Sequence, residues 1–125
     1  MKNKFENGKI TTLEKTIESE TIAWNNHPTF AGVSLKHLVK GQYTNNQLSC
    51  HLVRVESHCI LDTHIHNGIL EIHEVIDGSG TLFLDKSEVT YNIGSLSVIP
   101  ADTKHKVIAG DQGLYILVKF SPALL

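Results

Sequence analysis

The chain has 125 residues, of which 41% are hydrophobic and 19% are charged, and its formal net charge is −2. A chain of this length can bury a core without disulfides, and its charge gives no electrostatic reason to bind nucleic acid or an anionic membrane. No run approaches the roughly 20 apolar residues of a membrane span, and no apolar run follows the N-terminal basic residues, so we expect a cytoplasmic, single-domain protein.

Residues 1–28 differ in pattern from the rest and are expected to form an N-terminal arm. Thr11 and Glu14 fit the capping box of a helix start, and apolar residues recur nearby at almost helical spacing. A short helix and an edge strand are both compatible with this pattern. Trp24 is expected to anchor the arm on the domain.

From about residue 30 onward, almost every apolar run has the length of a strand and ends at a turn signal. The runs are VSLKHLVKG, LSCHLVRVE, EIHEVID, TLFLD, EVTYNI, LSVIP, HKVIA and LYILVKF. Short runs with regular turns between them predict an all-β, antiparallel sandwich or barrel. Cys50 and Cys59 lie up to about 30 Å apart along the expected strand and turn, beyond disulfide reach, so we expect free thiols.

The stretch HIHNGILEIHEVIDGSG, residues 64–80, combines histidines and acids with turn residues. Residues two apart on a strand point to the same side, so His64 and His66 present both imidazoles to one point, as a metal ion requires. Glu71 follows at an odd offset and would face away on a continuous strand. The intervening Asn-Gly pair breaks the strand, so the next strand can enter with Glu71 facing the histidines.

A third imidazole is available from the later stretch GSLSVIPADTKHKV. Gly94 ends one strand there, and Pro100 fixes the backbone at the end of the next. The tight ADTK turn then places His105 at the start of a returning strand.

Together, the two stretches resemble the two motifs of the cupin superfamily, in order and in spacing, over residues 58–109. The matching residues are His64, His66, Glu71, Gly78, Gly94, Pro100 and His105. The resemblance implies an antiparallel jelly-roll β-barrel over residues 29–125, with the arm outside it. It also implies that the glycines and the proline are structural, and that the histidines and the glutamate bind one divalent metal ion.

The chain departs from the cupin motifs at three positions, none of which binds metal in that family. His58 and Asp102 stand in turns where the motifs have glycine. Aspartate accepts left-handed backbone more readily than histidine, so the turn at His58 is expected to differ more in shape. Ala109 replaces the terminal asparagine of the second motif and removes a polar group from the expected pocket.

Three neutral imidazoles and one carboxylate leave a divalent ion with one positive charge and, in octahedral geometry, two open positions. The ligand set suits manganese, iron, nickel, cobalt or zinc and does not choose among them. An anionic, oxygen-rich small molecule could chelate through both open positions and be polarised by the metal as a Lewis acid. With iron, oxygen could be activated instead.

Two further residues are candidates for the chemistry. His73 shares the face of Glu71 and is a candidate catalytic acid or base, with a ligand partner or a core histidine as open alternatives. Arg54 would pair with a substrate carboxylate if it faced the cavity, but both registers of its strand are plausible. The histidines at positions 27, 37, 51 and 58 carry no functional prediction.

Two classes of function agree with this pattern. The first, which we favour, is a small metalloenzyme that performs isomerase, decarboxylase, lyase or dioxygenase chemistry on a small oxygenated metabolite. The second is a non-catalytic small-molecule or sugar-binding module, because one fold hosts many functions. Since arms such as residues 1–28 commonly cover sheet edges and pair small cupins, we also expect a homodimer.

Overall fold

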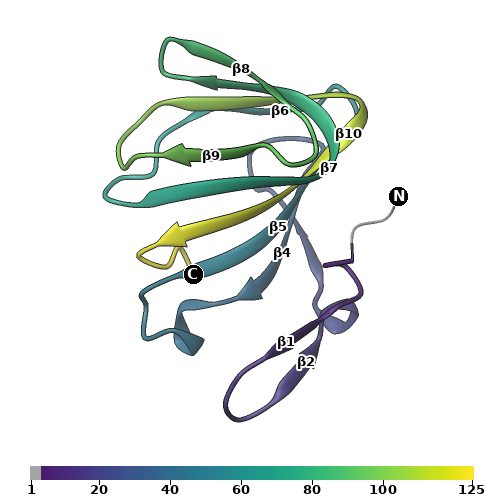
Figure 1. The fold of residues 1–125 in the computed structure, drawn as a ribbon, viewed down its shortest axis with the longest axis vertical. Coiled ribbons are helices and arrows are strands. Elements are labelled where there is room, and N and C mark those ends of the chain that lie inside the picture. The colour runs from purple at the N-terminus through teal and green to yellow at the C-terminus, as the bar shows by residue number, and fades with distance from the viewer. Residues whose placement is uncertain (1–3) are drawn as a thin grey trace.

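The computed structural model describes residues 4–125, which form ten β-strands and two short 3₁₀ helices (Figure 1). The strands are β1 (Lys9–Thr11), β2 (Thr16–Glu18), β3 (Trp24–Asn26), β4 (Val33–Val39), β5 (Ser49–Val55), β6 (Ile60–His64), β7 (Leu70–Leu84), β8 (Ser87–Tyr91), β9 (Leu96–Ile99) and β10 (His105–Ser121). The 3₁₀ helices are η1 (Ser19–Thr21) and η2 (Gly41–Tyr43). Every strand pairing is antiparallel, so the expected all-β jelly-roll architecture is confirmed.

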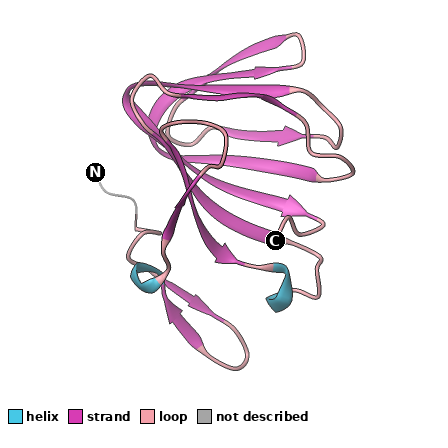
Figure 2. Ribbon diagram, turned by 180° about the vertical axis from the view of Figure 1, so that it is seen from behind, coloured by secondary structure: helices cyan, strands magenta, loops and turns pink. Residues whose placement is uncertain are grey.

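Two long strands connect the halves of the jelly roll. The main sheet has the order β3-β4-β5-β10-β7-β8, while β6 also pairs with β10 and β9 also pairs with β7. The first part of β10 lies between β6 and β7, and its last part lies between β5 and β7. The ribbon accordingly curves from one set of strands to the other (Figure 2).

Glycines permit the close approach of β7 and β10 where both strands bend. Gly78 has φ of 78° and Gly113 has φ of 75°, and a Cβ atom on Gly78 would collide with the carbonyl oxygen of Gly113. The register of the two strands shifts between Ala109 and Leu114. Gly78 therefore has the structural role that the cupin motif implies, because a larger residue would separate the strands.

The apolar side chains form two clusters on opposite faces of the β4–β5–β10 region. The larger fills the interior between the sheets and includes Val53, Val55 and Phe120. The smaller lies on the outer face around Leu52 and Leu117, where Trp24 and other side chains of the N-terminal segment pack on it. Trp24 thus anchors this segment, as expected.

The N-terminal segment contains no α-helix among the described residues, so the helical alternative is wrong. Residues 9–18 form the hairpin β1–β2, which projects from the other strands in Figure 1. The Thr12 hydroxyl accepts the N–H groups of Glu14 and Lys15 at 3.3 and 3.1 Å and so stabilises the turn. The edge-strand alternative holds for β3, which lies at the end of the strand order and, in the described part of the chain, pairs with β4 alone. The first three residues of the expected arm lie outside the described part of the chain.

Cys50 is buried and Cys59 is half-buried, and both are free thiols, as expected. No helix in residues 4–125 is long and apolar enough to cross a membrane.

Candidate metal centre

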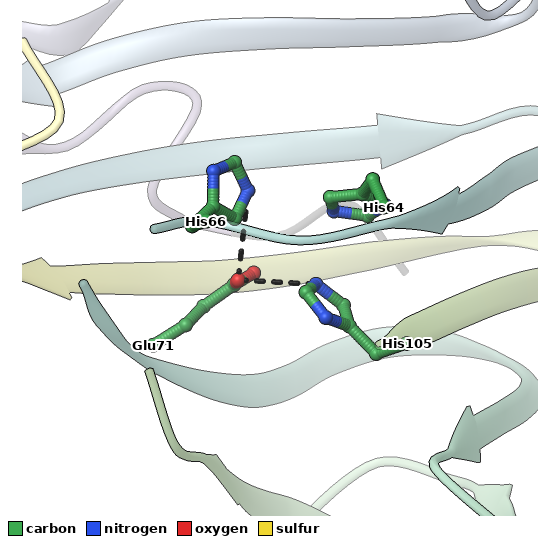
Figure 3. A group of neighbouring side chains, drawn as sticks. All are labelled: His64, His66, Glu71 and His105. Carbon is green, nitrogen blue, oxygen red and sulfur yellow. Dashed lines mark ion pairs between the residues drawn. The ribbon is translucent and has the colours of Figure 1, made fainter. Parts of the chain in front are cut away.

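Four side chains converge on one point at the end of the barrel interior. His64 ends β6, His66 lies in the following turn, Glu71 is the second residue of β7 and His105 is the first residue of β10. One potential ligand atom from each lies within 4.8 Å of the others (Figure 3). Donor atoms that bind one ion at about 2 Å lie at most about 4 Å apart, so a small inward movement would complete a metal site.

The two loops that carry these residues are tied to each other. Gly68 has φ of 68°, which makes the turn that lets β7 enter with Glu71 facing the histidines. The Gly68 N–H group donates to the Asp102 carboxylate at 2.9 Å, and the Asp102 N–H group donates to the His66 carbonyl at 3.3 Å. Asp102 itself has φ of 64°, so it takes the left-handed backbone of the glycine that it replaces.

His58 also adopts a left-handed backbone, with φ of 60°. Its ring lies 2.8 Å from the exposed Asp111 carboxylate. The turn at His58 therefore keeps the backbone conformation that a glycine would allow, despite the larger side chain.

Gly94 also has positive φ, of 95°, and its N–H group donates to the carbonyl oxygen of Val75. Pro100 follows β9 directly, and Ala109 is buried in the interior cluster.

Hydrogen bonds to the backbone fix the tautomers of two histidines. Nδ1 of His64 lies 2.6 Å from the Asp62 carbonyl, and Nδ1 of His105 lies 3.0 Å from the Thr103 carbonyl. A carbonyl oxygen can only accept, so in each ring Nδ1 carries the hydrogen. The Nε2 lone pairs are thereby left for a metal ion, in the arrangement common to metal-binding histidines.

Two buried side-chain atoms at the centre lack hydrogen-bond partners. They are Oε1 of Glu71 and Nε2 of His105, which lie 3.1 Å apart without the alignment of a hydrogen bond. Nε2 of His66 lies 3.7 Å from the same Glu71 oxygen. Buried polar atoms are nearly always satisfied, and a cation would satisfy both of these. The residues present therefore fit a divalent metal ion.

The protonation of these groups also suits a metal. Burial lowers the pKa of His64 to about 4 and lowers that of His66 below its usual value, so both rings are neutral near pH 7. Burial raises the pKa of Glu71, but the His105 and His73 imidazoles beside it outweigh burial and hold the pKa well below its usual range. Burial lowers the pKa of His105 as well, but the Glu71 carboxylate raises it overall. A divalent ion would compete with a proton for Nε2 of His105.

His73 lies behind Glu71 rather than in the cavity. It is fully buried, and its Nε2 lies 2.5 Å from Oε2 of Glu71, while its Nδ1 lies 2.9 Å from the Tyr91 hydroxyl. An ionised carboxylate accepts only, so Nε2–H donates to Glu71 and the Tyr91 hydroxyl donates to Nδ1. The position favours a partner of the ligand Glu71, and a catalytic role for His73 stays a prediction.

A cavity of about 80 Å³ adjoins the centre. His64, His66 and Glu71 line it together with side chains of β4, β5, β6 and β10. A small molecule in this cavity would therefore contact an ion held by the four residues.

Arg54 is not among the residues that line this cavity, so the register in which it would pair with a substrate is not the one found. Val53 and Val55 face the interior, and Arg54 faces outward, with its guanidinium carbon 4.2 Å from the centre of the Trp24 ring. Burial of β5 on both faces removed the alternation that would have revealed this register.

Two residues of the site were missed from sequence. His27, in the loop between β3 and β4, lines the cavity, and Tyr91, at the end of β8, supports His73. No spacing rule connects His27 to the cupin motifs. Tyr91 could have been suspected, because a buried tyrosine on an interior face needs a hydrogen-bond partner.

Comparison with known proteins identifies the fold. No family model and no curated protein match the sequence. Among solved structures, KdgF from Halomonas sp. is 19% identical with a TM-score of 0.72, over 82% of this chain and 90% of that chain. A protein described as a predicted oxalate decarboxylase from Thermotoga maritima is 19% identical with a TM-score of 0.76. The match covers 85% of this chain and 97% of that chain. An RmlC-like cupin from Shewanella frigidimarina is 17% identical with a TM-score of 0.75. The match covers 86% of this chain and 90% of that chain. The chain therefore has the cupin fold.

Proposed function

We propose that this protein is a metal-dependent cupin that binds a small oxygen-containing molecule in its barrel cavity and acts on it as an enzyme. His64, His66, Glu71 and His105 would hold one divalent transition metal ion. The observation that carries the proposal is the pair of buried side-chain atoms without a hydrogen-bond partner, Oε1 of Glu71 and Nε2 of His105, which lie 3.1 Å apart. Buried polar atoms without a hydrogen-bond partner are costly, and a metal ion bound by both atoms would remove this cost.

A bound divalent ion supplies Lewis-acid polarisation of a ligand oxygen or, if it is iron, access to oxygen chemistry. The residues of the chain would fix the geometry around it. Backbone carbonyls hold the rings of His64 and His105, and His73 holds one oxygen of Glu71, so the free oxygen points to the centre. The apolar cavity walls would exclude water from the ligand.

A non-catalytic binding module is the second candidate, and one observation favours it. Among the described residues that line the cavity, only His27 carries an ionisable group besides the proposed metal ligands. An enzyme at this site that needs a separate acid or base would have to use His27 or one of the proposed metal ligands. Recovery of the bound small molecule unchanged after prolonged incubation would favour this second candidate.

The test is elemental analysis of protein never exposed to nickel resin or chelator. We expect the parent to contain one transition metal ion, and His66→Ala and His105→Ala to be folded but metal-poor, since the apolar core does not depend on the ion. His58→Asn is the matched control, because it removes an exposed histidine and keeps a residue that tolerates positive φ. Equal metal content in all four proteins, or no metal in the parent after reconstitution, would contradict the proposal.

We further propose that the chain forms a homodimer and acts in the cytoplasm on a small molecule, without nucleic-acid or membrane partners. The homodimer is supported by exposed apolar side chains on β9, where Leu96 is 67% and Val98 is 58% exposed. Exposed apolar patches on a sheet face commonly mark contacts between protein chains.

A further inference from the structure

The cavity beside the centre is apolar apart from the proposed metal ligands and His27. Its other lining residues are all aliphatic or aromatic, among them Val33, Leu35, Val53, Val118, Phe120 and Leu124. A ligand that reaches the ion must therefore place the rest of its surface against hydrocarbon.

The strands of this wall also carry cations, but each cation is turned to the opposite face. On β4, Lys36 donates to the Ser19 carbonyl at 2.9 Å. On β5, Arg54 stacks on Trp24, and on β10, Lys119 lies 3.3 Å from the Glu74 carboxylate. Because successive residues of a strand face opposite sides, the residues beside these cations line the cavity and the cations do not.

This arrangement limits the charge of the ligand. A divalent ion with the Glu71 carboxylate retains one positive charge, which one ligand carboxylate or enolate can balance. A second ligand carboxylate in the cavity would meet no lysine or arginine among the described lining residues, so its burial would cost free energy. The site therefore disfavours dicarboxylates.

The volume limits the size of the ligand. The cavity measures about 80 Å³. An apolar cavity of about 150 Å³ accommodates benzene, so the space here accommodates an apolar group of only about three or four carbon atoms.

His27 supplies one hydrogen-bond donor to this space. Its Nδ1 accepts the N–H groups of Thr29 at 3.1 Å and Phe30 at 3.2 Å, so the ring hydrogen lies on Nε2. The ring stacks on Phe30 with 4.5 Å between centroids, which fixes its orientation. Nε2–H is thus the group that His27 can offer to a ligand.

From these features we propose that the cavity selects a small, singly charged chelating ligand with a short apolar tail, such as a short-chain 2-oxo acid, and that His27 donates a hydrogen bond to it. The inference rests on the proposed metal-binding function and specifies the ligand class of the same site. The 2-oxo acid end provides two oxygen atoms for the two open positions of an octahedral ion. The tail then lies against the aliphatic wall.

A matched pair of probes tests the charge selection. In the cobalt(II)-loaded protein, the visible absorption spectrum reports both metal uptake and a change of ligands. We expect 2-oxopentanoate to bind at least about tenfold more tightly than 2-oxoglutarate, which has the same chain length but ends in a carboxylate instead of a methyl group. Binding of 2-oxoglutarate that is equal or tighter, or no response to either probe, would overturn the inference. Failure of cobalt to bind, visible before any probe is added, would instead contradict the proposed function.

A gain-of-charge variant sharpens this test. Leu124 follows β10 and is half-buried, so Leu124→Arg should be tolerated by the fold. It should raise the affinity for 2-oxoglutarate relative to 2-oxopentanoate by about tenfold and leave cobalt uptake unchanged. An unchanged ratio of affinities in a folded, cobalt-loaded variant would contradict the proposed position of the ligand tail.

Two substitutions of His27 separate its donor from its structural acceptor. His27→Asn keeps an acceptor near the Nδ1 position and removes Nε2, whereas His27→Gln keeps a donor near Nε2. We expect His27→Asn to weaken 2-oxopentanoate binding by about fivefold, with cobalt uptake unchanged, and His27→Gln to retain most of the affinity. No loss in His27→Asn, or equal loss in both variants, would overturn the role of His27.

Discussion

The Glu71 carboxylate is held through one of its two oxygens, and this sets how it can bind an ion. His73 occupies Oε2 at 2.5 Å, and Tyr91 supports His73 from behind. Oε1 alone remains directed at the histidines. Glu71 is therefore arranged as a ligand through a single oxygen, which leaves more of the coordination sphere open to a small molecule.

Removal of the His73 donor should weaken metal binding without abolishing it. His73→Phe keeps a buried ring but loses the N–H group that orients Glu71, and we expect the metal affinity to fall by about 10- to 100-fold. His73→Gln, which can still donate through its amide, should lose less. Competition with a coloured chelator measures both affinities, and an unchanged affinity in folded His73→Phe would contradict this positioning role.

Arg54 should matter for stability and not for the metal or its ligand. Its guanidinium covers Trp24 on the outer face, so Arg54→Ala should lower the free energy of unfolding by about 1 kcal/mol. Cobalt uptake and 2-oxopentanoate affinity should equal those of the parent. Arg54→Lys, which keeps a cation but loses the planar stack, is the control. A selective loss of ligand affinity in Arg54→Ala would restore the original prediction of a substrate contact.

The grouping of the four candidate ligands could be predicted from sequence because short, local turns position them. The break at Gly68 was sufficient to turn Glu71 toward His64 and His66. His27 could not be predicted, because it reaches the cavity only through the tertiary packing of the loop before β4. Local patterns identify the ligands of this site, but they do not identify the residues that contact a ligand from another part of the fold.

At the scale of elements, β5 is buried on both faces, and its histidine lies in the interior. His51 is fully buried between Nδ1 of His37 and the Ser49 hydroxyl, both at 2.8 Å. Burial, followed by the nearby His37, lowers the pKa of His51 to about 4. The folded state thus resists protonation of a group that titrates near pH 6.5 in the unfolded chain.

Stability should therefore fall as the pH falls from about 6.5 to 4. In this window the unfolded chain binds a proton at His51 and the folded protein does not, so acid favours unfolding, by up to about 3 kcal/mol at pH 4. Urea denaturation of metal-free protein at pH 7.5 and pH 5 measures the effect. His51→Gln cannot titrate and should show a shallower pH dependence. The same slope in both proteins would exclude His51 as a source of acid sensitivity.

The N-terminal hairpin shows why a motif can mislead when its neighbours are ignored. Thr11 and Glu14 have capping-box spacing, but Thr11 pairs with Thr16 across the hairpin, and Ile10 pairs with Ile17. Leu13, which completed the helical spacing, is fully exposed at the tip. Cross-strand pairing of β-branched residues determines the structure of this segment.

At the scale of the whole molecule, the apolar runs located the strands from residue 33 onward except β6, but they did not show where two runs belong to one strand. The runs EIHEVID and TLFLD are both parts of β7, and HKVIA and LYILVKF are both parts of β10. Glycines lie between the runs in each case, and they read as turns in the sequence. In the structure they allow a bend without ending the strand, and only pairing with distant neighbours decides between these outcomes.

The proposed dimer is tested by the mass in solution. We expect light scattering after size-exclusion chromatography to give twice the chain mass of 13.8 kDa. Val98→Asp should produce a folded monomer, because it buries a charge in the proposed contact on β9. Lys86→Gln, in the turn between β7 and β8, is a control with the same change of net charge at an exposed position. A parent of monomer mass at micromolar concentration would contradict the dimer.

The place of β10 in the sheet also determines when the proposed metal centre can form during folding. His105 is the first residue of β10, and β6 and β7 each pair with this strand. A refolding chain consequently has no complete centre until β10 has docked, and pairing between such distant segments is slow. If metal is present during refolding, the protein should bind it no faster than β10 docks. The metal would slow the unfolding of the finished molecule, but it would not accelerate its formation.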